Sequence, residues 1–197
     1  MTQETLSEPV VTALSLANGD DSLYEVVDGQ RVEKPFMSVY GIRIAFVLAT
    51  YVDVFVKAHK LGRVVVEAIF GLPLPRGLQQ RRPGAAFVSY QRWAKNRPLP
   101  HTDPWPVVPE LAIEVISKSN PGEGILDKIQ EYFDAGVQLV WVVYPKQCLV
   151  YVYGSPTDIH VLPQTGELDG ASVLPGFKLP VAALFEDGKE IAAASKP

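Results

Sequence analysis

A carboxylate stands inside an apolar run near the middle of the chain. Residues 110–117 predict a short strand, and alternation along it places Glu114 on the same face as Ala112 and Ile116. A buried carboxylate is strongly destabilised unless a metal ion, a cation or several hydrogen-bond donors contact it. Glu114 is therefore a candidate metal-binding acid; the plainer alternative is a glutamate that faces water at the edge of a sheet.

A lysine follows on the next predicted element, a helix over residues 123–135 that ends at Gly136. Ile125, Lys128 and Tyr132 fall along one side of this helix, so Lys128 can reach inward. An ammonium beside a carboxylate that binds a divalent cation would orient or activate a water molecule for hydrolysis. The alternative is that Lys128 extends outward along its aliphatic stem.

The elements around these two residues form a recognisable pattern. Strand, helix and a second apolar strand over residues 137–144 predict a βαβ crossover, which joins two parallel neighbours. Upstream, residues 24–33 predict a β-hairpin, because Asp28-Gly29 readily adopts the positive φ angles of a tight turn. Glu25 lies on the first strand of this hairpin. Residues 38–60 predict the longest helix, with apolar residues at the three-and-four spacing of one face.

The remaining segments are shorter. Residues 63–70 and 85–89 predict strands, the first ended by the turn-forming residues 71–75, and the proline-rich residues 98–109 predict a surface loop. Residues 148–153 predict an antiparallel return strand, and short strands follow up to residue 185. We therefore expect one domain over residues 18–187, an N-terminal arm over 1–17 and a tail over 188–197.

The composition fits a single globular domain. A chain of 197 residues that is 47% hydrophobic can bury one sizeable core. Cys148 is the only cysteine, which excludes an intrachain disulfide and a cysteine-based zinc site. The N-terminus lacks the basic and apolar regions of a secretory signal, so we expect a cytoplasmic protein without a membrane span.

The net charge of -4 gives no overall attraction to nucleic acid, so any contact with DNA requires a local basic surface. Residues 76–101 hold six basic residues and no acidic one. Within this stretch Arg81, Arg82, Arg92 and Lys95 are candidates for contacts with DNA phosphates. The alternative is an ordinary solvated face.

The order of these features resembles the Uma-two family of restriction-endonuclease-like proteins, a branch of the PD-(D/E)xK nuclease superfamily. The resemblance covers most of the chain. It implies an α/β (α+β) domain with a restriction-endonuclease-like mixed central β-sheet flanked by helices. The motifs that carry it are the hairpin, the long helix, Arg82-Pro83-Gly84-Ala85-Ala86-Phe87-Val88, the strand around Glu114, the helix around Lys128, and Trp141-Val142-Val143-Tyr144-Pro145.

The resemblance also implies a site. It places Glu25 at an early acidic position, Glu114 as the metal-binding acid and Lys128 as the lysine supplied by the following helix. Mg²⁺ or Mn²⁺ is the implied cofactor and DNA the implied partner. Ile116 occupies the usual position of the lysine, and Lys118 on the adjoining loop is a weaker candidate for that role.

Two positions depart from the family pattern. Gly84 stands where the pattern has an aspartate that binds the metal directly, and no histidine begins the long helix. Loss of a carboxylate weakens both metal binding and water activation. Glu67, on a strand expected to lie near Gly84, is a candidate replacement ligand, with a solvent-facing side chain as the alternative, and Asp103 is a weaker candidate.

Two functions are therefore expected as alternatives. The first is a Mg²⁺-dependent DNA endonuclease, in which Glu25 and Glu114 hold the metal and Lys128 assists the attacking water. The second is a catalytically inactive module for binding or assembly, which the glycine at position 84 favours. A third, a sugar- or nucleotide-binding domain, has no phosphate-binding glycine motif to support it. By analogy with enzymes that cut both strands of a duplex, we expect a homodimer.

Overall fold

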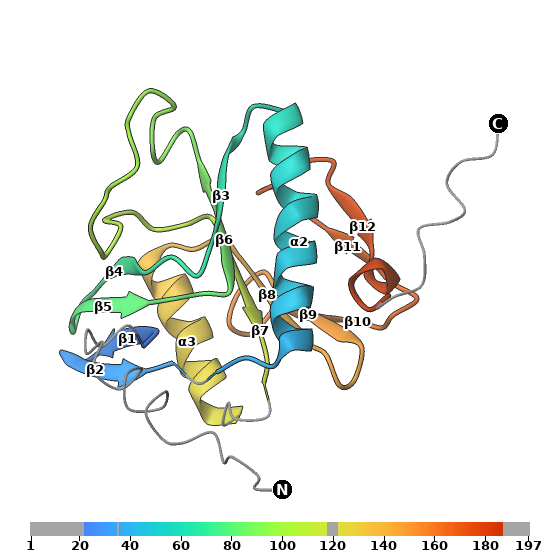
Figure 1. Cartoon of the computed structure of the whole chain (residues 1–197), viewed down its shortest axis with the longest axis horizontal. Coiled ribbons are helices and arrows are strands. Elements are labelled where there is room, and N and C mark those ends of the chain that lie inside the picture. Colours follow the sequence, from blue (N-terminus) through green and yellow to red (C-terminus); the bar gives the residue numbers. More distant parts are fainter. Residues whose placement is uncertain (1–21, 35, 118–121, 187–197) are drawn as a thin grey trace, which may run out of the picture.

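A six-stranded mixed sheet forms the centre of the computed structural model, which describes residues 22–34, 36–117 and 122–186. The strand order is β10-β9-β8-β7-β6-β3 (Figure 1). The β7–β8 pair is parallel and the other neighbouring pairs are antiparallel, which confirms the predicted crossover and the antiparallel return strand. The strands are β3 (Gly62–Val66), β6 (Ala85–Ser89), β7 (Leu111–Val115), β8 (Leu139–Tyr144), β9 (Leu149–Tyr153) and β10 (Ile159–Leu162).

A second, four-stranded antiparallel sheet lies beside the first, with the order β2-β1-β5-β4 (Figure 1). The predicted hairpin is confirmed, because Asp28 and Gly29 have φ angles of 50° and 78° at its turn. The strands are β1 (Tyr24–Val27), β2 (Gln30–Glu33), β4 (Phe70–Leu74) and β5 (Gly77–Arg81). Glu25 is therefore held on a strand that pairs with the chain segment leading into β6.

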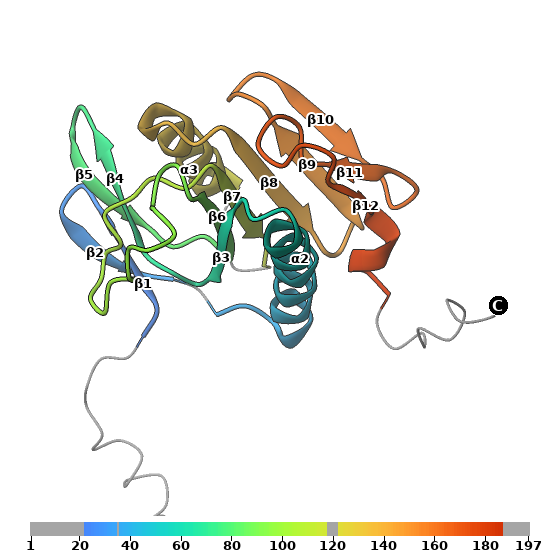
Figure 2. The same ribbon diagram turned by 90° about the horizontal axis from the view of Figure 1, so that it is seen from above.

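Two helices cover opposite faces of the central sheet (Figure 2). Helix α2 (Val39–Ala58) begins at Ser38, whose Oγ accepts a hydrogen bond of 3.1 Å from the Gly41 N–H. Helix α3 (Gly122–Ala135) is the crossover between β7 and β8. A small hairpin of β11 (Glu167–Asp169) and β12 (Lys178–Pro180), followed by the short helix η1 (Val181–Leu184), extends the core beside α2.

Alternation along β7 divides the interior into two cores. Leu111 and Ile113 pack in the core that contains the inner face of α2, whereas Ala112 packs in the core that contains Ile129 and Tyr132 of α3. Glu114 follows the alternation of Ala112 and points to the α3 side. The fold thus directs the one carboxylate of this strand toward the inner face of α3.

The sequence prediction was wrong in one region. The strand expected over residues 63–70 ends at Val66, and Glu67 follows it with a φ angle of 50°. Residues 71–74, expected to form a turn with Pro75, belong to β4. This strand tolerates Pro73 because β4 lies at the edge of its sheet. The predicted arm over residues 1–17 and tail over 188–197 lie outside the described residues.

Candidate active site

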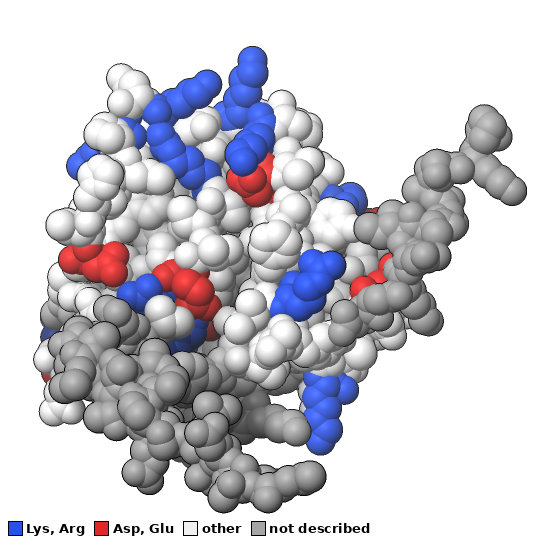
Figure 3. All heavy atoms as spheres, viewed as in Figure 1, with Lys and Arg blue, Asp and Glu red and all other residues white. Residues whose placement is uncertain are grey.

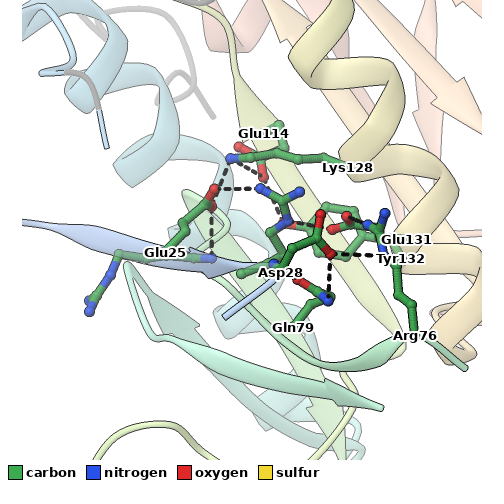
Figure 4. Close-up of polar contacts among 10 residues, drawn as sticks. Glu25, Asp28, Arg76, Gln79, Glu114, Lys128, Glu131 and Tyr132 are labelled. Atoms are coloured by element: carbon green, nitrogen blue, oxygen red, sulfur yellow. Dashed lines mark hydrogen bonds and ion pairs between the residues drawn. The ribbon is translucent and has the colours of Figure 1, made fainter. Parts of the chain in front are cut away.

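Three side chains from three different elements meet between the central sheet, the second sheet and α3 (Figure 4). Lys128 of α3 places its Nζ 2.8 Å from Oε1 of Glu25 on β1 and 3.5 Å from Oε1 of Glu114 on β7. The side chains of the two glutamates are only 7% and 3% exposed. Glu25, Glu114 and Lys128, which the sequence analysis selected for their chemistry, therefore meet in one buried cluster.

Helix α3 supplies two of the groups that contact Glu114. Lys128 and Tyr132 lie one helical turn apart, so both side chains face β7. The hydroxyl of Tyr132 donates a hydrogen bond of 2.7 Å to Oε1 of Glu114. This oxygen is thus oriented by a phenol and an ammonium at the same time, which satisfies a carboxylate that would otherwise be costly to bury.

The second sheet supplies the contacts of Glu25. The pairing of Val26 with Gln80 brings the end of β5 beside Glu25, where Arg81 Nη1 lies 3.0 Å from Oε2 and the Arg82 N–H donates to Oε1 at 3.0 Å. Arg81 also donates through Nε to Glu131 of α3 at 2.5 Å. Arg81 therefore links β5, β1 and α3, and fixes Glu25 against the lysine.

The charges of this cluster are set by burial and by the partners. Burial alone would raise the pKa of Glu25, but Lys128, the Arg82 N–H and Arg81 together hold it below the ordinary value of 4.5. Burial lowers the pKa of Lys128, but the nearby carboxylates outweigh it and the pKa lies above 10.5. Lys128 is therefore an ammonium at neutral pH, suited to orienting water and stabilising negative charge.

The place of the missing aspartate lies next to Glu67. A Cβ at Gly84 would lie 3.4 Å from the Ile113 carbonyl oxygen and 4.0 Å from Oε1 of Glu67. This Oε1 is buried and has no hydrogen-bond partner among the described residues, while Oε2 binds Lys34 at 2.6 Å. Glu67 thus points an unpaired carboxylate oxygen at the space beside the glycine.

The surroundings of Glu67 raise the pKa of its carboxyl group. Burial raises it, the Lys34 ammonium lowers it, and the charge of Glu114 raises it further, so that it lies above 4.5. The Lys34 ammonium therefore does not fully compensate the cost of ionising the buried Glu67 carboxyl group. A cation between Glu67 and Glu114 would offset the rest of that cost.

These residues fit a divalent cation with oxygen ligands. Within the described ranges, no group of three or more His, Cys, Asp and Glu side chains is arranged to hold a metal ion. Mg²⁺, however, is usually bound by one or two protein carboxylates, with water and substrate phosphate as the other ligands. The unpaired oxygen of Glu67 and the carboxylate of Glu114 are the candidates for these ligands.

Most of the basic residues expected at a DNA surface have other partners. Arg81 and Arg82 are buried, and the Arg82 guanidinium donates to the carbonyl oxygens of Tyr24 and Glu67. Arg92 donates to three backbone carbonyl oxygens and pairs with Glu110. These three guanidinium groups thus have partners within the fold, and their contact with DNA stays a prediction.

Lys95 remains on the surface. It belongs to an exposed group with Lys57, Lys60 and Arg97, and Figure 3 shows basic side chains gathered over the end of α2 and the neighbouring loop. Asp103, the weaker replacement ligand, is half exposed and lies 3.4 Å from Arg82. Lys118, the alternative lysine, lies outside the described residues.

A comparison with solved structures supports the fold. A search of curated proteins finds no match. A solved structure described as a putative nuclease belonging to DUF820, from Anabaena variabilis ATCC 29413, is similar in fold, with a TM-score of 0.68. Its sequence identity is 17%, and the match covers 82% of this chain and 89% of that chain.

A family model describes the function class more specifically. The model named Uma2, with the description "Putative restriction endonuclease", matches residues 11–182. This span includes Glu25, Glu114 and Lys128 of the buried cluster and the glycine at position 84. The chain belongs to the Uma2 family of restriction-endonuclease-like proteins.

Proposed function

We propose that the protein hydrolyses phosphodiester bonds of DNA in a reaction that depends on Mg²⁺ or Mn²⁺, with a metal site that Gly84 has weakened. The observation that carries the proposal is the Lys128 ammonium held between two buried carboxylates, Glu25 and Glu114. Three separate elements must fold together to create this arrangement, and burying it has a high energetic cost. Such costly clusters are typical of functional sites.

Glu114 and Glu67 are the residues that would hold the cation. When bound, the ion supplies polarisation of a phosphoryl oxygen and lowers the pKa of a water molecule. Tyr132 keeps the Glu114 carboxylate in a fixed orientation through its 2.7 Å hydrogen bond. Glu67 lies next to Gly84 in space and takes the role that the family pattern gives to an aspartate at position 84.

Lys128 and Glu25 act as a pair. The ammonium of Lys128 donates to a water molecule or to a phosphate oxygen and stabilises the negative charge that develops there. Glu25 positions this ammonium at 2.8 Å and keeps it charged. Arg81 and the Arg82 N–H hold Glu25 in turn, so a change at any of these positions reaches the lysine.

A plasmid-nicking assay in Mg²⁺ or Mn²⁺ tests the proposal. We expect the wild type to convert supercoiled into open-circular DNA, and Glu114→Gln and Glu67→Gln to lose this activity. Glu167→Gln, at an exposed ion pair far along the chain, is the matched control and should retain it. Activity that survives in Glu114→Gln, or that is equal with and without divalent cations, would overturn the proposal.

A second function is supported by Gly84. If two carboxylates are too few to bind the metal, the fold serves as a DNA-binding module without catalysis, with the exposed Lys57, Lys60, Lys95 and Arg97 as its phosphate contacts. The Gly84→Asp variant separates the two functions. A wild type that binds DNA but never nicks it, together with a Gly84→Asp variant that binds Mn²⁺ more tightly in a calorimetric titration, would favour the module.

A further inference from the structure

Helix α2 carries large apolar side chains on its outer face as well as on its inner face. Its buried side includes Ile44, Leu48 and Val52, which pack on the central sheet. A helix with one buried face normally shows polar residues on the other. On α2 the outer face carries polar residues, but among them stand large apolar side chains, Val39, Ile42, Phe46 and Val54, which are 85%, 54%, 60% and 63% exposed.

These exposed side chains are part of a wider apolar surface. Leu23, Phe36 and Val66 are also exposed, and they border a cavity of about 290 Å³ together with Ile42 and Phe46. Among the elements of residues 22–34, 36–117 and 122–186, Figures 1 and 2 show no helix or strand that lies outside α2 on this face of the sheet. Contiguous apolar surfaces of this kind on a folded domain mark sites of association.

The exposed positions of α2 are arranged symmetrically about Leu48. When a second copy of the helix lies antiparallel with Leu48 as the midpoint, Ile42 of one copy falls opposite Val54 of the other. In the same register Phe46 falls opposite Thr50, which is also exposed. The same register sets Val39 opposite Lys57, so the apolar pairs across the twofold axis are those of Ile42 with Val54.

The charged residues beside these apolar side chains obey the same symmetry. Arg43 and Asp53 lie five residues to either side of Leu48, so the antiparallel register places each Arg43 opposite the Asp53 of the other copy. Among the described residues Arg43 has no ion pair, and Asp53 pairs only with Lys57 of its own helix at 2.5 Å. Two copies would thus gain two ion pairs at the rim of an apolar contact.

We propose that the outer face of α2 is a twofold interface between two copies of this chain, packed antiparallel about Leu48 with Arg43 of each copy paired to Asp53 of the other. A DNA backbone fits this surface poorly, because α2 carries only two basic residues, Arg43 and Lys57, among several large apolar side chains. A membrane does not fit it either: α2 has the length and composition of a span, but its inner face is an integral part of the core. The inference does not depend on nuclease activity.

Sedimentation velocity across a dilution series tests the interface. We expect a reversible dimer, which Phe46→Glu weakens at least about a hundredfold because a charge replaces a side chain at the centre of the contact. Val161→Glu, at an exposed apolar residue of β10, is the matched control and should leave the dimer unchanged. Thermal melting of each variant shows whether it is folded.

Charge reversal tests the register. Arg43→Asp and Asp53→Arg should each weaken the dimer roughly tenfold, because each creates two like-charge pairs, and the double variant should restore it. A protein that stays monomeric at the highest concentration would overturn the inference. So would a dimer that Val161→Glu disrupts, a double variant no better than the single ones, or an apolar face that is covered by another macromolecule.

Discussion

Replacing Lys128 with methionine tests the central cluster most sharply. The change keeps most of the aliphatic volume and removes the ammonium that contacts Glu25 and Glu114, whose side chains are 7% and 3% exposed. Removing one member of a buried ion pair costs about 3–5 kcal/mol. Glu25 keeps Arg81 and Glu114 keeps Tyr132, so we expect the lower end, about 3 kcal/mol.

This loss has a thermal and a pH signature. For a domain of this size, about 3 kcal/mol corresponds to a fall in the melting temperature of roughly 6–12 °C. In the wild type the pKa of Glu25 is held below 4.5, so its stabilising effect is present above that pH and is lost as the pH falls. Without Lys128 the pKa of Glu25 rises, so the loss of stability relative to the wild type should grow as the pH rises past 4.5 and this carboxylate ionises.

Chemical denaturation at several pH values, with Lys146→Met as an exposed control, provides the measurement. We expect a clear loss of stability that is smallest at the lowest pH, and a control that matches the wild type. A loss below about 1 kcal/mol with an unchanged pH profile would refute this expectation, because an exposed ion pair contributes no more than that.

Three further predictions concern the supports of the site and are checked by denaturant unfolding. Arg81→Met leaves two buried carboxylates without their shared guanidinium and should lower the free energy of unfolding by about 3 kcal/mol. Gly62→Ala places a Cβ 2.2 Å from the Val88 carbonyl oxygen, so β3 must shift, and we expect a loss of at least about 2 kcal/mol. Ser38→Ala removes the acceptor for the Gly41 N–H and should cost about 1 kcal/mol, with the rest of the fold unchanged. Losses near zero in any of the three would contradict the contact concerned.

The parts of the site that local patterns encode could be predicted. Glu114 interrupts an apolar strand with a charge, and Lys128 and Tyr132 share one side of the next helix. Because a crossover helix packs on the strands that it joins, those two patterns already imply that the side chains meet. The turn of Asp28-Gly29 fixed the hairpin that carries Glu25 in the same local way.

The parts that depend on distant pairing could not be predicted. Residues 70–81 contain glycines and prolines that locally favour a turn, but they form the two strands of a hairpin, and β5 also pairs with β1. The partners of Arg81 follow from that pairing. In the sequence this arginine is one member of a basic stretch, and only the fold shows that it is buried between Glu25 and Glu131.

Glu67 illustrates both what the sequence could predict and what it could not. The sequence indicated that it could reach the space beside Gly84, and the structure places its Oε1 4.0 Å from a Cβ built there. The expected reason, an extended strand through residue 67, was wrong, because the strand ends at Val66 and Glu67 turns with a positive φ angle. Lys34, which binds the other oxygen of Glu67, gave no sign of this role in the sequence.

The position of a bound metal ion tests the central claim most directly. Crystals of the wild type grown with Mn²⁺ and measured at its absorption edge would locate the ion by its anomalous scattering. The account predicts a peak in contact with carboxylate oxygens of Glu114 and Glu67, beside Gly84, and no peak in Glu114→Gln. A crystal soaked at saturating Mn²⁺ that shows no peak beside Glu114 and Glu67, or that binds Mn²⁺ only elsewhere, would contradict this claim.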